Sequence, residues 1–406
     1  YKQSFDTYNG EPIVNYAADE SWGPRMDGQP VRQWYSWYPD DPDFGKQTPF
    51  SPNPDNIRSF YENGRILSNN IALSGGSDAA LFRLSYTNLN QKGTIPNSKM
   101  DRNTLNFSGS SKLSDKLTAN ISANYVKTNT FGRPSTGYSA DQGNVVTSFN
   151  QWFQRQIDMD KLRNYKTADG ADRTWNIKSP TNLDPLYWEN PYWVLNESPT
   201  VDSRSRLFGN ASLSYQILPE LSVAAFARTD FYTDRREQRI ASRSIPQDKY
   251  SEEIRDVREN NFEFLAQYNK TFGDISVAAI GGANIRMQSY YLNSAATAGG
   301  LNVPNYFNIG ASVDRPAITD FFNEKQVNSV YGSLNLGWKD IVYLDASIRN
   351  DVSSTLPVEN NSYLYPALGG SFVFTSLFER KVLSFGKLRV GWAQVGSDTD
   401  PYQLSN

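Results

Sequence analysis

The sequence predicts an all-β fold, an antiparallel transmembrane β-barrel, on three observations. Aromatic residues make up 14% of the 406 residues, yet the mean hydropathy is −0.60. Long stretches alternate apolar and polar residues with a period of two, as strands do when their faces meet different environments. Short and long connections also alternate along the chain, as in outer-membrane barrels. Composition alone would fit a soluble all-β protein equally well, so the prediction depends on the other two observations.

Several function classes are excluded by composition. The chain has no cysteine and no histidine, which removes disulfides, thiolate or imidazole metal sites and Ser-His-Asp or Cys-His catalysis. Carboxylate-only chemistry of the glycosidase kind stays open. No run of 18 apolar residues is present, so no transmembrane helix is expected. The 40 basic and 43 acidic residues are well mixed, and no basic stripe suited to nucleic acid is visible.

The first 68 residues differ from the rest in their amino-acid composition. They are rich in Pro, Asp, Trp and Tyr, above all over residues 34–43. Proline at this density excludes long helices and central strands. Both termini look cut, because residues 1–3 resemble neither an initiator Met nor a signal peptide and residues 400–406 stop in a turn-like stretch. We therefore expect the chain to be a piece of a longer protein.

From about residue 69 onward the sequence predicts roughly a dozen strands. Residues 208–217 and 342–349 are examples of strict alternation, and residues 251–272 and 317–339 exceed the 9–11 residues that a membrane strand needs. Tight turns are expected within 113–117, 218–221, 272–275 and 338–341. Long connections are expected at about 130–203, 240–251 and 295–316. The short turns should face the periplasm and the long connections the outside.

Aromatic residues near strand ends are expected to form an interfacial girdle at headgroup depth. Ordinary sheet packing is the alternative. The girdle is favoured because the accompanying strands are too polar on their other face for a dry soluble core. The residues are Tyr125, Tyr232, Tyr268, Tyr290, Tyr291, Trp338 and Trp392.

A set of short motifs resembles the SusC-like branch of TonB-dependent transporters. Residues 20–31 resemble a signature of that family, carried here by Ser21, Trp22, Gly23, Pro24, Asp27 and Gly28. Further motifs follow in the family's order at residues 60–64, 69–76, 92–102, 190–193, 353–357 and 392–402. Each motif is short, but their order and spacing along nearly the whole chain make the resemblance specific.

The resemblance implies a bacterial outer-membrane importer whose full barrel has about 22 strands and is closed by a plug. Residues 1–68 would be the end of the plug and its connection to the barrel. Residues 69–406 would be the first portion of the barrel, about half of it, with long extracellular loops. The implied ligand is an oligosaccharide or an oligopeptide. The implied partners are a SusD-like surface lipoprotein, the TonB complex through a segment missing from this chain, and the lipid and lipopolysaccharide of the outer membrane. No cofactor, enzyme activity or nucleic-acid partner is implied.

The long connection at 130–203 holds the candidate ligand or partner contacts. They are aromatic rings that the sequence interpretation takes to be exposed: Trp152, Trp175, Trp188, Tyr192 and Trp193. Exposed rings stack on sugar faces or grip peptide side chains. The alternative is that they pack the loop against itself or against a partner protein. Two other features are weaker: Asp40, Asp41 and Asp43 could offer oxygen ligands to calcium, and the Gly-Gly pairs at 75–76 and 281–282 lie in strand patterns rather than phosphate loops.

Two other classes of function compete with active import. An outer-membrane or secreted glycan-binding or glycan-degrading protein would need two convergent carboxylates for catalysis, and nothing marks such a pair. A passive porin or an adhesin would not need the plug-like first 68 residues.

Overall fold

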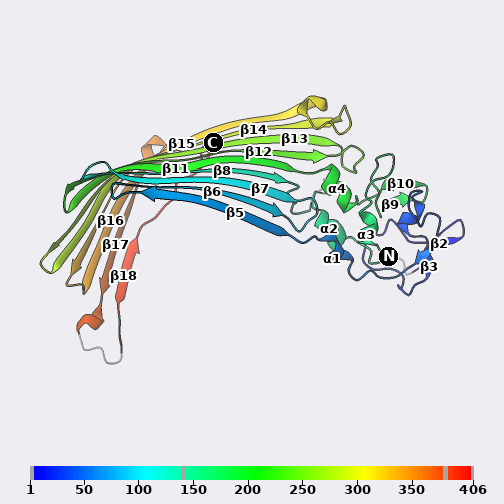
Figure 1. Cartoon of the computed structure of the whole chain (residues 1–406), viewed down its shortest axis with the longest axis horizontal. Helices are drawn as coiled ribbons and strands as arrows, with labels where there is room; N and C mark the ends of the chain where they lie inside the picture. The colour runs from blue at the N-terminus through cyan, green and yellow to red at the C-terminus, as the bar shows by residue number, and fades with distance from the viewer. Residues whose placement is uncertain (1–3, 139–142, 378–382, 404–406) are drawn as a thin grey trace.

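The computed structural model describes residues 4–138, 143–377 and 383–403. Its centre is one antiparallel sheet of 12 strands, in which each strand pairs with its neighbour along the chain. The strands follow one another as a meander across the curved sheet (Figure 1). Among the described residues, no helix is long and apolar enough to cross a membrane.

The sheet contains the long strands that the alternation predicts. They are β5 (Arg65–Gly76), β6 (Ala80–Lys92), β7 (Lys99–Lys112), β8 (Leu117–Phe131), β11 (Val201–Leu218), β12 (Leu221–Ile240), β13 (Lys249–Phe272), β14 (Ile275–Leu301), β15 (Ser312–Trp338), β16 (Val342–Ser353), β17 (Ser362–Phe372) and β18 (Leu388–Ala393). The predicted meander of about a dozen strands is confirmed. The first strand begins at Arg65, four residues before the expected boundary.

The register gives the sheet two unlike faces. Ala211, Ala227 and Phe262 pair side by side on one face, which we call the apolar face. One position away, Asn210 and Arg228 pair on the other, which we call the polar face. This difference explains the low mean hydropathy, because only one side chain in two meets an apolar environment.

Most of the short turns lie where they were expected, at one end of the sheet. The turn between β15 and β16 holds Lys339 and Asp340, both with positive φ angles of 52° and 57°. Two consecutive positive φ angles match the right-handed twist of a hairpin. At the other end the third long connection is shorter than expected, since β14 runs to Leu301 and β15 starts at Ser312. The pairing of β14 with β15 continues past the predicted ends, with register shifts between Ala296 and Ala298 and between Ala298 and Leu301.

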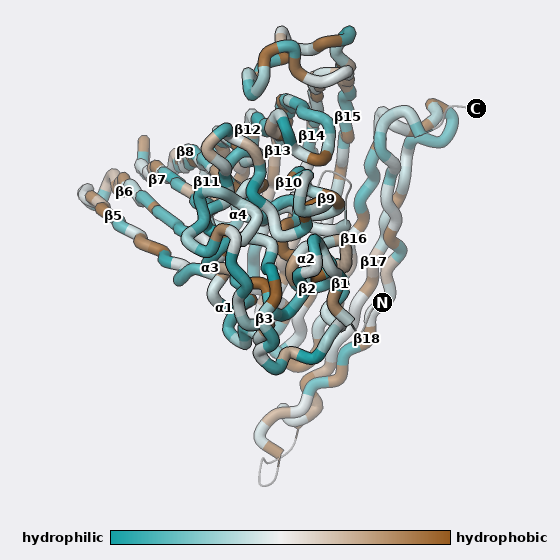
Figure 2. The backbone as a smooth tube through the Cα atoms, turned by 90° about the vertical axis from the view of Figure 1, so that its right-hand side faces the viewer, coloured by the Kyte–Doolittle hydropathy of each residue, from teal (hydrophilic) through white to brown (hydrophobic). Residues whose placement is uncertain are grey.

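Beyond the long-connection end of the sheet lies a compact lobe of residues 4–64, 132–138 and 143–200 (Figures 1 and 2). Its elements are β1 (Asp6–Tyr8), β2 (Glu11–Ile13), β3 (Pro30–Val31), η1 (Trp34–Trp37), β4 (Thr48–Pro49), α1 (Asn56–Phe60), α2 (Val145–Asn150), α3 (Met159–Leu162), β9 (Ile177–Ser179), β10 (Asn182–Pro185) and α4 (Pro191–Glu197). The remaining short 3-10 helices are η2 (Ile309–Ala311), η3 (Val358–Asn360) and η4 (Phe374–Leu377).

One hydrophobic core joins the two halves of this lobe. Val31, Trp34 and Phe60 from the first half pack in the same cluster as Phe149 and Trp193 from the second. Residues 4–64, 132–138 and 143–200 therefore form a single structural unit at the end of the sheet. Their expected division into plug and barrel loop remains a prediction.

The girdle prediction needs a correction for two of its residues. Tyr232 pairs with Arg206, and Tyr290 pairs with Val257 and Asn323, at polar-face positions. Tyr125, Tyr268, Tyr291, Trp338 and Trp392 have the parity of the apolar face. The error arises because the position of a ring near a strand end does not by itself identify the face of the sheet that the ring occupies. That face is known only once the register of the strand is known.

Candidate functional site

The candidate aromatic residues are mostly part of the lobe's core. Trp193 is 1% exposed, Trp175 2%, Tyr192 4% and Trp188 8%, while Trp152 is half-buried. The expectation that these rings are exposed is therefore wrong for four of the five. Trp152 stacks on Trp188 with ring centroids 6.4 Å apart, so even this ring is partly covered by its neighbour.

Polar contacts between distant segments explain the burial. The Asn176 side chain donates to the Tyr16 carbonyl at 2.7 Å and accepts from the backbone N–H groups of Tyr187 and Trp188. The Asn56 Oδ1 accepts the Met159 N–H at 2.7 Å. Buried amides satisfied in this way fix one chain segment against another. Asn190 caps α4 by accepting from Tyr192 N–H, with Pro191 as the first helical residue.

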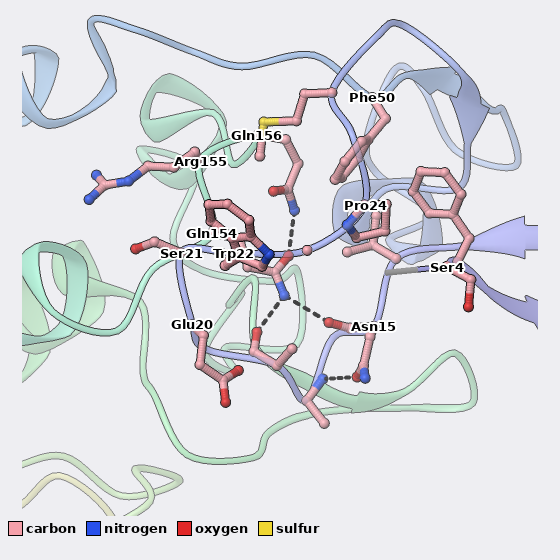
Figure 3. A pocket seen from close by; sticks show the side chains of 16 residues that line it. Ser4, Asn15, Glu20, Ser21, Trp22, Pro24, Phe50, Gln154, Arg155 and Gln156 are labelled. Atoms are coloured by element: carbon pink, nitrogen blue, oxygen red, sulfur yellow. Dashed lines mark hydrogen bonds between the residues drawn. The ribbon is translucent and has the colours of Figure 1, made fainter. Parts of the chain in front are cut away.

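The family signature lines a cavity on the lobe. Ser21, Trp22, Gly23 and Pro24 form part of its wall, and it encloses about 230 Å³ (Figure 3). Trp22 is 69% exposed. The Ser21 hydroxyl donates to the Phe153 carbonyl at 3.2 Å. The signature thus presents a large ring at a solvent-accessible hollow.

Amide groups form the floor of this cavity. Gln154 Nε2 donates to the Asn15 carbonyl at 2.8 Å and to the Ala18 carbonyl, and Gln156 Nε2 donates to Gln154 Oε1 (Figure 3). Glu20 and Arg155 also line it. A ring beside amides and charges of both signs can bind an amphipathic ligand segment.

The last two signature residues have a structural place outside this cavity. Gly28 has a φ angle of +89°, a conformation that glycine adopts at no steric cost. Its N–H donates to the Phe50 carbonyl at 3.0 Å. The Asp27-Gly28 pair therefore forms the turn that leads into β3.

The acidic stretch at residues 40–43 is paired with cations. Lys161 Nζ lies 3.0 Å from Asp41 Oδ1 and 2.9 Å from Asp43 Oδ2. The buried Arg173 guanidinium bonds Asp41 and lies 3.6 Å from Asp40. Burial alone would raise the pKa of Asp41, but hydrogen bonds from Asp43 N–H and Lys161 and the charge of Arg173 hold that pKa below its usual value. These carboxylates join the two halves of the lobe.

Two further carboxylates are buried in the lobe. Asp172 Oδ2 accepts the Asn190 N–H at 3.1 Å, and its Oδ1 has no hydrogen-bond partner among the described residues. Glu189 Oε1 accepts the Ile245 N–H at 2.7 Å from the β12–β13 connection. Burial raises the pKa of Glu189 to about 7. Burial and the nearby Glu189 raise the pKa of Asp172 well above its usual range.

The polar face of the sheet carries a second set of functional candidates. Arg228 lies 2.6 Å from Glu263 on the next strand, and the Tyr331 hydroxyl donates to the same carboxylate. Arg349 lies over the Tyr331 ring at 5.4 Å. Arg206 Nε donates to Asp230 Oδ1 at 2.8 Å. Sequence reasoning missed these pairs, since only the register shows that charges of opposite sign on successive strands share one face.

The upper ends of β12 and β13 carry further ion pairs at the surface. Arg235 pairs with Glu252 at 2.5 Å and with Glu237 at 3.2 Å, and Arg236 pairs with Asp234 at 2.8 Å. The Arg235 side chain is 50% exposed. Pairs of this kind contribute little to stability individually.

Comparisons with known proteins agree on one kind of molecule. TonB-dependent receptor P26 of Formosa agariphila is 23% identical over 368 residues, covering 87% of this chain and 35% of that protein. TonB-dependent receptor P3 of the same organism is 24% identical over 336 residues, covering 78% of this chain and 31% of that protein. The chain thus spans about a third of the length of the curated relatives it matches. No protein-family model matches it.

Among solved structures, the RagAB peptide transporter has a similar fold. Its TM-score is 0.65 at 18% identity, covering 85% of this chain and 38% of that one. The similarity indicates that the 12-stranded sheet has the fold of one arc of a β-barrel. The period-two strands, the two unlike faces and the ordered motifs agree with these comparisons: the chain is similar to TonB-dependent receptors and folds as part of a β-barrel of the bacterial outer membrane.

Proposed function

We propose that the protein containing this chain imports an oligosaccharide or an oligopeptide across the outer membrane, driven by TonB, without covalent chemistry. The observation that carries the proposal is the sheet with one apolar face and one face of paired charges. A barrel wall built in this way meets lipid on the first face and encloses a polar interior with the second. The ion pairs of Arg228 and Arg206 lie on that interior face.

The lobe supplies the proposed surface for capture outside the cell. It lies at the end of the sheet where the long connections gather (Figure 1), which is the extracellular end in this class of barrel. Its exposed aromatic rings include Trp22, Tyr138 and Tyr187, at 69%, 70% and 56%. We assign ligand or partner contact to these rings and to Trp152. The buried Trp175, Trp188, Tyr192 and Trp193 hold the surface in shape.

A SusD-like surface lipoprotein is the proposed partner at this end. Aromatic side chains are enriched where protein surfaces meet, because they bury a large area at low entropic cost. The TonB complex would act through a segment outside this chain. Both partners come from the family resemblance, and the exposed rings of the lobe supply a suitable surface for the first.

The imported ligand is an oligopeptide in one version of this proposal and an oligosaccharide in the other. The RagAB neighbour is a peptide transporter by name, and this favours testing oligopeptides first. The polar face offers charges of both signs, which suit the termini and side chains of peptides. Hydroxyl-rich glycans would use the same amide and aromatic groups around Trp22.

Uptake by cells tests the proposal directly. Cells that express the full-length protein are incubated with a library of fluorescent oligopeptides or oligosaccharides. They should accumulate some members of the library, and deletion of TonB should abolish that accumulation. A Trp22→Ala variant should weaken uptake while the level of protein in the membrane is unchanged. Uptake that persists without TonB would identify a passive pore, and hydrolysed product in the medium would identify an enzyme.

A further inference from the structure

The apolar face of the first strands ends before the strands reach the lobe. Its last apolar row crosses β6, β7 and β8 at Tyr86, Leu105 and Tyr125. The next row on the same side of the sheet is polar and consists of Asn88, Asn103 and Lys127. Tyr86 Oη donates to Asn103 Oδ1 at 2.6 Å, and Asn88 Nδ2 donates to the same oxygen at 2.9 Å. Rings with a polar tip mark the edge of a hydrocarbon layer, so this layer ends at the row of Tyr86.

Farther toward the lobe, the same side of the sheet carries three cations in one row. Arg65 on β5 lies opposite Lys92 on β6, and Lys92 lies opposite Lys99 on β7. All three residues are exposed. We call them the basic row. Like charges directly opposite one another on neighbouring strands are destabilising, so an anion bound to this row would relieve their repulsion.

The chain itself supplies little negative charge to the basic row. Lys92 Nζ lies 2.5 Å from Glu62 Oε2. Lys99 Nζ lies 5.1 Å from the centroid of the Phe131 ring. Neither Lys99 nor Arg65 has a carboxylate oxygen within 4.0 Å in the part of the chain that the structure describes. Two of the three cations are therefore available to an external anion.

A hollow of about 450 Å³ adjoins the basic row, and all three cations line it. The neighbouring row also lines it, with Asn90, Asp101, Asn129 and Ser203. Asp101 accepts hydrogen bonds from the side chains of Asn88 and Asn103, so its carboxylate is already bonded within the sheet. Cations beside amide and hydroxyl groups suit a sugar that carries phosphate, because the cations bind the phosphate and the neutral groups bind sugar hydroxyls.

The height of the hollow above the hydrocarbon layer distinguishes between anionic lipids. Lys92 lies six residues beyond Tyr86 on β6, which is about 20 Å along the strand. At a strand tilt of about 35–45° this is about 15 Å along the membrane normal. The headgroup layer on each side of an ordinary phospholipid bilayer is about 5–8 Å thick. A phospholipid phosphate therefore lies short of the hollow, whereas a phosphate on a larger sugar headgroup reaches it.

We propose that the basic row binds a phosphate group on the sugar headgroup of lipopolysaccharide. Asn90, Asn129 and Ser203 bind the sugar that carries this phosphate, and the acyl chains of the same molecule lie on the apolar face. The site rests on the proposed orientation, in which the lobe lies outside the cell. It does not depend on import, because the imported ligand passes on the polar face of the sheet.

The test uses the full-length transporter, purified in detergent and titrated with lipopolysaccharide, with bound molecules counted by native mass spectrometry. The unmodified protein should bind lipopolysaccharide, and removal of the phosphates from the lipopolysaccharide should weaken binding by about tenfold or more. The triple variant Arg65→Gln, Lys92→Gln and Lys99→Gln should lose a similar factor with untreated lipopolysaccharide. Phosphatidylglycerol should bind the unmodified protein and the triple variant equally, because its phosphate does not reach the basic row.

The matched control is the triple variant Lys112→Gln, Lys116→Gln and Lys339→Gln. It removes the same charge from exposed residues at the short-turn end of the sheet, and it should bind lipopolysaccharide like the unmodified protein. An equal loss in the control would assign the effect to net charge and overturn the proposal.

Unchanged binding after the phosphates are removed would overturn it as well, and this measurement uses the unmodified protein, so it does not depend on the folding of any variant. Weaker binding of phosphatidylglycerol to the basic-row variant would overturn the assigned lipid. Uptake is not part of the readout, so a failure of the import proposal leaves each of these outcomes decisive.

Discussion

Burial of two carboxylates makes the lobe sensitive to pH. The pKa of Glu189 is raised to about 7 and that of Asp172 is raised well above its usual range. The two carboxyl groups therefore bind protons more tightly in the folded lobe than in the unfolded chain. Their contribution to the free energy of unfolding is greatest below the ordinary carboxyl pKa, and it is lost as the pH rises through about 7. We predict that the lobe resists protease better at pH 5 than at pH 8.

A Glu189→Gln variant should flatten that pH dependence, since the amide can accept from Ile245 N–H without a charge. Asp41 does not obscure the comparison, because its lowered pKa places its titration at more acidic pH. Equal protease resistance at both pH values in the unmodified protein would show that Glu189 titrates normally.

The aromatic residues divide into scaffold and surface, and substitution should separate them. Trp193→Ala removes a fully buried ring that donates to Ser244 at 3.0 Å. The expected loss is about 3–5 kcal/mol in the free energy of unfolding of the lobe. Trp22→Ala removes an exposed ring and should change that free energy by less than about 0.5 kcal/mol. Hydrogen exchange of lobe amides measures both, and comparable losses would refute the division.

This division also shows where sequence reasoning fails at the residue scale. Trp175, Trp188, Tyr192 and Trp193 stand among Asn, Pro and Asp residues, a composition typical of a solvated loop. Their burial depends on contacts with residues more than 100 positions earlier, such as Asn176 with Tyr16. No local periodicity encodes a contact at that separation, whereas Ser21 to Pro24 could be singled out by their motif alone.

Among the strands, Gly282 has a packing role that can be tested. A Cβ atom at Gly282 would lie 2.5 Å from Cζ of Tyr331, the residue that donates to Glu263. Gly282→Ala should therefore displace the ring and lower the free energy of unfolding by about 1–3 kcal/mol. Unfolding of the full-length protein in urea with lipid measures the change.

Gly281→Ala is the matched control, because a Cβ there meets nothing within 4 Å. Removing the ring in a Gly282→Ala, Tyr331→Ala double variant should make the alanine at 282 nearly neutral. A cost at 282 that persists without the ring would assign the effect to backbone freedom instead.

Strands were the most predictable elements. Alternation of period two depends only on one face being apolar, so β11 and β16 could be identified from residues 208–217 and 342–349. The ends were less predictable, since β14 and β15 continue into residues expected to be loop. Hydrogen bonding between neighbouring strands extends them past the point where the hydrophobic signal ends.

At the scale of the whole molecule, the arrangement of the lobe and the short turns predicts the orientation of the chain in the outer membrane. The chain has no cysteine, so single cysteines can report on each side of the membrane. Thr181→Cys, in the lobe, should react with a membrane-impermeant maleimide on intact cells. Ser114→Cys, in the β7–β8 turn, should react only after the outer membrane is opened. The reverse pattern would invert the topology.

The shared core of the lobe has a consequence for how the strands find their register. Closing a chain segment into a loop costs entropy that grows with its length, and β5 to β8 lie between the two halves of the lobe. Once Trp34 and Phe60 pack against Phe149, the start of β5 and the end of β8 are held near each other. Much of the conformational entropy that pairing of these four strands would cost has then already been lost in forming the core of the lobe. A hydrophobic cluster outside the membrane would thus act as a template that limits sliding of the strands inside it.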